Sequence, residues 1–123
     1  MSNINSYRDL IVWQKSKELC KQVYKATERM PRAEIFGLTS QMRRAAVSIP
    51  SNIAEGYNRK TRPEHIRALR IASGSQAELS TQWEIAVELG LAPSDPTMVS
   101  LLAEIDRMLF ALIRRLENAP PKR

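Results

Sequence analysis

Residues 37–56 read GLTSQMRRAAVSIPSNIAEG, and this stretch decides the fold. Its apolar side chains recur every three or four residues, which is the spacing of one face of an α-helix. The inward-facing positions are Met42, Ala45, Ala46, Ile49, Ile53 and Gly56. We therefore expect one packing helix that has Leu38 or Thr39 at its cap and runs to about Tyr57.

Pro50 falls inside this pattern and predicts a bend in the helix. Proline has no N–H group, so the carbonyl of Ala46 loses its helical partner, at a cost of about 3 kcal/mol in a helix interior. A polar row beside the apolar face can satisfy the opened hydrogen-bond ladder or line an interface. Its members are Arg44, Ser48, Asn52 and Glu55. Two short helices that meet at Pro50 are the alternative.

Three further amphipathic stretches predict three more helices. The first covers about residues 9–29 and stops before Pro31, because the residue ahead of a proline resists helical angles. The second covers residues 61–89, with a threonine cap at its start and a glycine after its end. The last covers residues 95–118, where an aspartate cap is followed by Pro96 at the first helical position.

Four helices with short connections predict the fold class: an all-α, antiparallel up-down-up-down four-helix bundle whose second helix is kinked at a proline. We expect a single domain over residues 1–118 and a disordered basic tail over residues 119–123. Gly74, inside the third helix, marks either a close approach of another backbone or a tolerated surface position.

Composition favours a polyanionic partner. The 123 residues carry 19 Lys and Arg against 13 Asp and Glu, a formal net charge of +6, although the charge can also serve solubility. The one cysteine, Cys20, lies in an apolar stripe and is expected to be a buried structural thiol. The N-terminus is polar, and the longest apolar run, residues 108–113, is far shorter than the roughly 20 residues of a membrane span. We expect a cytoplasmic protein with no membrane contact.

The residues needed for common catalytic sites are missing. His65 is the one histidine and has no Glu three residues before it, so a di-iron centre and a nucleophile with a histidine base are not expected. Neither a glycine-rich phosphate loop nor a dinucleotide motif is present. Glu55 beside Asn52 could act as an acid or base, but a structural hydrogen-bonding role is expected. We therefore predict a non-enzyme with no catalytic residue, metal or cofactor.

Basic residues gather at the turn between the second and third helices, where Glu64 is the lone acid. Such residues can hold phosphates without reading sequence, and the hold weakens with salt. The candidate nucleic-acid contacts are Arg43, Arg44, Arg59, Lys60, Arg62, Arg67 and Arg70. A solvated helix end is the alternative. No aromatic residue interleaves with these charges along the chain, so base stacking is not expected.

The last helix is apolar over about 200° of its surface, whereas one buried face needs little over 100°. The excess predicts a second contact surface, and a helix wedged deeply into its own bundle is the alternative. The candidate subunit contacts are Val99, Leu101, Ala103, Met108 and Phe110.

From Tyr7 to Leu116 the chain resembles the four helix bundle proteins encoded in intervening sequences of bacterial 23S ribosomal RNA genes. The resemblance rests on residues 9–15, on the long and specific stretch from Phe36 through Gly56, and on residues 69–79. Trp83 and Glu84 depart from the family pattern, which has aliphatic residues there more often.

The resemblance implies an antiparallel four-helix bundle, commonly a ring of five subunits, without known catalysis. A related branch, the accessory protein of diversity-generating retroelements, binds nucleic acid through a basic surface and works beside a reverse transcriptase. No residue assigns this chain to that branch. The leading hypothesis is a non-catalytic oligomer, a pentamer by resemblance, that binds RNA or DNA non-specifically as an accessory or adaptor. The rival hypothesis is a protein–protein interaction scaffold with no nucleic-acid role.

Overall fold

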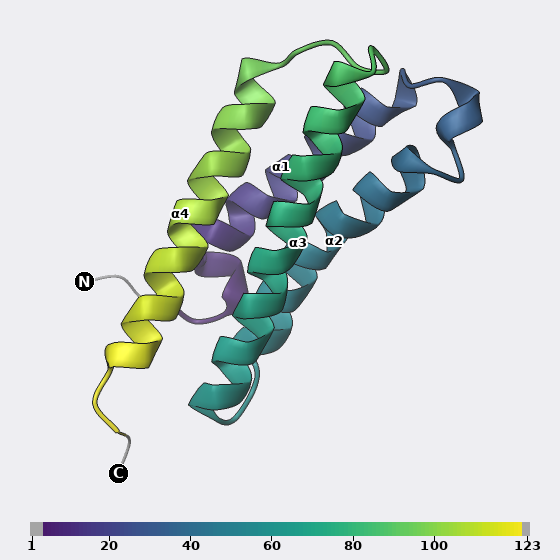
Figure 1. Ribbon diagram of the computed structural model, residues 1–123. Helices are drawn as coiled ribbons and strands as arrows, with labels where there is room; N and C mark the ends of the chain where they lie inside the picture. Colours follow the sequence, from purple (N-terminus) through teal and green to yellow (C-terminus); the bar gives the residue numbers. More distant parts are fainter. Residues whose placement is uncertain (1–3, 122–123) are drawn as a thin grey trace.

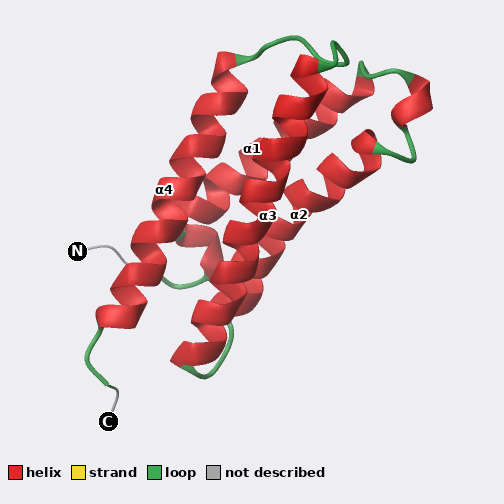
Figure 2. Ribbon diagram, in the orientation of Figure 1, coloured by secondary structure: helices red, strands yellow, loops and turns green. Residues whose placement is uncertain are grey.

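The computed structural model describes residues 4–121 and shows four long α-helices and no strand within that range (Figure 1). The helices, red in Figure 2, are α1 (Ile11–Glu28), α2 (Leu38–Tyr57), α3 (Arg62–Glu88) and α4 (Pro96–Asn118). Single 3-10 turns at Tyr7–Asp9 and Arg32–Glu34 precede α1 and α2. The predicted all-α class is confirmed. Residues 1–3 of the predicted domain and residues 122–123 of the predicted tail lie outside the described residues.

Each helix packs against the next one along the chain, and α4 also packs against α1. The α2–α3 contact is the most extensive. Figure 1 shows the α1–α2 and α3–α4 connections at one end of the molecule and the α2–α3 turn at the other. We call the end with the α2–α3 turn and the last turns of α4 the basic end, because most of the candidate arginines lie there.

Local capping signals set two of the helix starts as predicted. Thr61 Oγ1 accepts a hydrogen bond from the N–H of Glu64 at 3.3 Å, and Pro63 occupies the first turn of α3. Asp95 Oδ1 accepts from the N–H groups of Thr97 and Met98 at 3.0 and 3.3 Å. These side chains satisfy donors that the first turn of a helix leaves without partners.

Two other helix starts differ from the prediction. The first helix begins at Ile11 rather than near Asp9, because Ser6 and Asp9 form a capping box around a separate 3-10 turn. Gly37, not Leu38 or Thr39, is the cap of α2, and it offers no side-chain oxygen. Glu34, in the 3-10 turn before α2, supplies the missing acceptor, since its Oε1 accepts a hydrogen bond from the N–H of Leu38 at 3.3 Å.

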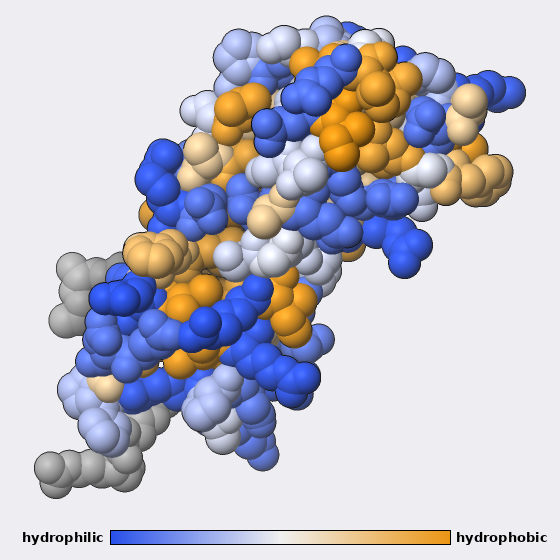
Figure 3. Space-filling view, in the orientation of Figure 1, coloured by the Kyte–Doolittle hydropathy of each residue, from blue (hydrophilic) through white to orange (hydrophobic). Residues whose placement is uncertain are grey.

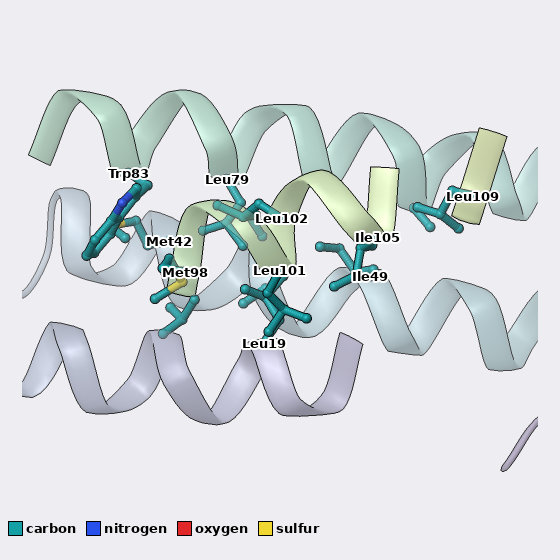
Figure 4. Packing of buried hydrophobic residues seen from close by; sticks show 14 of the residues in the cluster. Leu19, Met42, Ile49, Leu79, Trp83, Met98, Leu101, Leu102, Ile105 and Leu109 are labelled. Atoms are coloured by element: carbon teal, nitrogen blue, oxygen red, sulfur yellow. The ribbon is translucent and has the colours of Figure 1, made fainter. Parts of the chain in front are cut away.

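All four long helices contribute to one hydrophobic core. Figure 4 shows its middle layers, where side chains from the four helices point toward one another. The labelled members are Leu19, Met42, Ile49, Leu79, Trp83, Met98, Leu101, Leu102, Ile105 and Leu109. Burial of such side chains supplies the main favourable term in folding, on the order of 1.5–3 kcal/mol for each large one.

α2 continues through Pro50 as one helix, so the alternative of two short helices is wrong. The carbonyl of Ala46, which Pro50 leaves without its helical donor, accepts a hydrogen bond from the Cys20 thiol of α1 at 3.0 Å. Burial raises the pKa of this thiol from its ordinary 9.0 to about 11, so the thiol keeps its proton at neutral pH. A neighbouring helix therefore satisfies the opened carbonyl.

The polar row of α2 bonds within itself and to α3. Ser48 and Ser75 share a hydroxyl–hydroxyl hydrogen bond of 2.8 Å, and the Asn52 side-chain amide donates to the carbonyl oxygen of Ser48 at 2.8 Å. This network crosses the α2–α3 interface and fixes how the two helices face each other.

Gly56 is the glycine that permits close approach. A Cβ at this position would lie 2.8 Å from the Cβ of Ala68 and 3.2 Å from the carbonyl oxygen of His65, both on α3. A Cβ at Gly74 would meet nothing within 4 Å. Gly74 was expected to be either a site of close backbone approach or a surface glycine, and within this chain it is a surface glycine.

Candidate nucleic-acid interface

The turn between α2 and α3 brings basic side chains close to acidic ones. Arg59 follows the end of α2, Arg67 lies one turn inside α3, and both line a shallow depression with Glu55 and Glu64. The guanidinium of Arg59 pairs with Glu55 at 3.0 Å, and both side chains are exposed. An exposed pair of this kind contributes little to stability, so Arg59 can exchange Glu55 for a phosphate at small cost.

Two of the predicted contacts hold other parts of the chain. Arg62 donates to the carbonyl oxygen of Ala119 at 2.8 Å and to that of Pro120. Ala119 and Pro120 therefore lie against the start of α3, although the sequence predicted a disordered tail from residue 119 onward. Arg70 pairs with Glu117 of α4, which links the lower halves of α3 and α4.

Lys60 and Arg67 are exposed and make no ion pair within residues 4–121. Among the five basic residues of the turn and early α3, these two are the ones that offer unengaged cations. At these two positions a phosphate contact would displace no ion pair of the described chain.

Arg43 and Arg44 lie far from this turn. Position 43 precedes position 59 by four and a half turns of helix, which corresponds to about 24 Å along α2. The guanidinium of Arg43 stacks over the ring of Tyr24 at 4.6 Å, and its Nε donates to Thr27 Oγ1 at 2.8 Å. Arg43 thus joins α2 to α1. The sequence grouped Arg43 with the basic residues of the turn, and the structure corrects that grouping.

Arg44 sits beside the α2–α3 polar network. It is exposed and lines a shallow depression with Ser48, Ser75 and Glu78. Like Arg67, Arg44 has an acidic residue beside it and makes no ion pair within residues 4–121, so what sets it apart is its distance from the turn.

The structure adds basic residues that the sequence reading missed. An open groove of about 890 Å³ runs between the lower halves of α3 and α4, and its lining includes Arg70, Arg107 and Arg114. Figure 3 shows hydrophobic residues in orange at this place, bordered by hydrophilic ones in blue. The lining also includes Ser73, Asp106, Phe110, Ile113 and Glu117. A spacing of three and then four residues places Arg107, Phe110 and Arg114 on one face of α4, and this signal could have been found in the sequence.

The predicted subunit contacts of α4 divide into exposed and buried residues. Phe110 is 65% exposed and Val99 53% exposed, and Ala103 is exposed as well. Leu101 is only 9% exposed and belongs to the core of this chain, which corrects its assignment to an outer surface. Met108 is half-buried and packs against the same core. The error arises because Leu101 and Val99 differ by two residues, or about 200° around a helix.

No group of three or more His, Cys, Asp or Glu side chains is close enough to hold a metal ion among the described residues. The ring of His65 stands edge-on to that of Tyr57, 6.4 Å away. No helix within residues 4–121 is both long enough and apolar enough to span a membrane.

Four helices around one core, with arginines gathered along a groove at one end, define the class of small basic helical-bundle proteins. The family follows from comparison. The family model described as 23S rRNA-intervening sequence protein matches residues 8–112, and the chain therefore belongs to this family. The resemblance seen in the sequence is confirmed. No curated protein matches the chain.

Proposed function

We propose that this protein is a non-catalytic, oligomeric helical bundle that binds RNA or DNA without sequence specificity, as an accessory or adaptor. The observation that carries the proposal is the basic end, where α3, α4 and the α2–α3 turn together present Lys60, Arg67, Arg107 and Arg114 without ion pairs in the described chain. Phosphates favour such a surface through counterion release.

The proposal includes an antiparallel up-down-up-down arrangement with a bend at Pro50, and a cytoplasmic location. It also includes a ring of five subunits, as the family resemblance implies. A ring requires two different patches on each subunit, and the exposed Val99 and Ala103 of α4 supply one of them. Five copies repeat the basic end five times, so weak contacts at each copy add up through avidity. A reverse transcriptase is a partner only if the chain belongs to the retroelement branch.

A salt series tests the nucleic-acid role directly. The double variant Lys60→Gln/Arg67→Gln loses two phosphate contacts, and the log–log slope of affinity against salt should fall by about 1.4–1.8. The matched control is Lys21→Gln/Lys25→Gln, which removes the same charge from exposed positions of α1. Filter binding measures both. Equal losses in the two variants, or no retention of any nucleic acid by the unmodified protein at low salt, would reject the proposal.

A second candidate function is a protein-binding scaffold. It is favoured by the apolar side chains at the end opposite the basic end, where Phe36 is 96% exposed and Ile35 and Leu89 are also exposed. Figure 3 shows orange residues at this end. Under this alternative, Phe36→Ser abolishes capture of a specific protein that persists after nuclease treatment, while nucleic acid has no effect.

A further inference from the structure

Phe110 stands among arginines on the wall of the α3–α4 groove. Arg107 and Arg114 lie one turn before and one turn after it on α4, about 10 Å apart along the helix. Arg70 faces them from α3. The chain thus places one exposed aromatic ring between cations, on a helix outside the seven basic residues proposed from the sequence.

The charges of the groove are unequally engaged. Arg70 is paired with Glu117, an acidic residue that lines the groove with it. Arg107 and Arg114 have no ion pair within residues 4–121. Two unengaged guanidinium groups that flank an exposed ring match the parts of one nucleotide: phosphates on either side and a flat base between them.

A double helix cannot use this arrangement, because its bases are already stacked on one another. A single strand can turn a base outward and lay it on an aromatic face. We propose that the α3–α4 groove binds single-stranded RNA or DNA, with a base stacked on Phe110 and phosphates on Arg107 and Arg114. The inference rests on the proposed nucleic-acid role and adds strand type and a stacking residue to it.

A second copy of this chain is the other occupant to consider for an exposed phenylalanine. Such a copy would cover Arg107 and Arg114 together with Phe110. Burial of charges that lack acidic partners costs several kcal/mol per ion, whereas phosphates compensate them. The lining holds three arginines against Asp106 and Glu117, so a net positive charge remains, and this favours a polyanion.

Fluorescence anisotropy with two labelled probes tests the inference: a short oligouridine RNA and a blunt-ended RNA duplex with the same number of phosphates. We expect Phe110→Ala to weaken binding of oligouridine about tenfold and to leave duplex binding unchanged. Phe110→Trp should keep the affinity, and the new indole should lose fluorescence when oligouridine binds. Phe36→Ala removes an exposed aromatic ring outside the groove and serves as the control.

The outcomes separate this inference from the wider proposal. If the unmodified protein binds neither probe, the nucleic-acid role itself is rejected. If it binds both probes and Phe110→Ala binds them equally well, only the stacking site is rejected. Light scattering compares the assembly mass of Phe110→Ala with that of the unmodified protein at equal concentration. A lower mass for the variant would assign Phe110 to a subunit contact and overturn the inference.

Discussion

The thiol of Cys20 takes the place of the backbone N–H that Pro50 cannot provide. In an unbroken helix the N–H of residue 50 would donate to the carbonyl of Ala46. The Cys20 thiol donates to that carbonyl instead, from a different helix. The sequence allowed two inferences separately, an unpaired carbonyl at Ala46 and a buried structural cysteine. Their connection could not be predicted, because 26 residues separate the two partners along the chain.

We expect Cys20→Ala to lower the free energy of unfolding by about 1–2 kcal/mol, since the carbonyl of Ala46, a fully buried residue, loses its donor. Cys20→Ser should lose less, because its hydroxyl can still donate. Urea denaturation at one fixed protein concentration measures these changes. In a Pro50→Ala background, residue 50 regains an N–H, and the cost of Cys20→Ala should shrink. Simple additivity of the two substitutions would contradict the coupling.

The raised pKa of Cys20 predicts a loss of stability in alkaline solution. Below pH 9 the thiol is protonated in the folded and the unfolded chain, so its contribution is complete. As pH rises from 9.0 toward about 11, the unfolded chain releases this proton first, and stability falls. The measurement is the difference in unfolding free energy between the unmodified protein and Cys20→Ala across this range. A difference that does not change with pH would contradict the prediction.

At the scale of the element, helix starts were predictable where one side chain caps its own helix, as Thr61 and Asp95 do. The start of α2 was missed because the glutamate that caps it belongs to another segment. The candidate arginines could be picked out from the sequence, but the ion pairs and hydrogen bonds that they make within the chain could not. The pairing of Arg70 with Glu117 spans 47 residues, and only the folded bundle brings the two together.

The two glycines of α2 and α3 give a matched pair of substitutions. Gly56→Ala places a methyl group against α3 and should destabilise the protein by about 1–3 kcal/mol. Gly74→Ala adds a methyl group in open space and should stabilise the protein by up to about 1 kcal/mol, since alanine favours the helix. Thermal denaturation followed by circular dichroism compares the two. Destabilisation by Gly74→Ala would instead reveal another chain packed at that position.

At the scale of the whole molecule, the net charge of +6 and the exposed residues of α4 bear on assembly. Val99 and Ala103 of α4 are exposed, as a contact surface requires, yet the sequence could not separate these positions from the core residue Leu101. That separation depends on the rotation of α4 about its axis, and packing against α1 and α3 fixes the rotation.

Light scattering should give a mass near five times 14.0 kDa for the unmodified protein. Val99→Asp places a charge in the proposed subunit contact and should reduce the mass toward that of a single chain. Ile85→Asp, at an exposed apolar position of α3, is the control and should leave the mass unchanged. A single-chain mass for the unmodified protein at high concentration would reject the ring.

The sheltered thiol has a practical consequence for spectroscopy. Cys20 is the one cysteine of the chain, and burial keeps it protonated and slow to react with maleimide dyes near neutral pH. A cysteine engineered at an exposed position would therefore take up a fluorophore selectively, without removal of the native one. Pairs of labelled chains then permit energy-transfer measurements of how far apart neighbouring copies sit while they hold a strand.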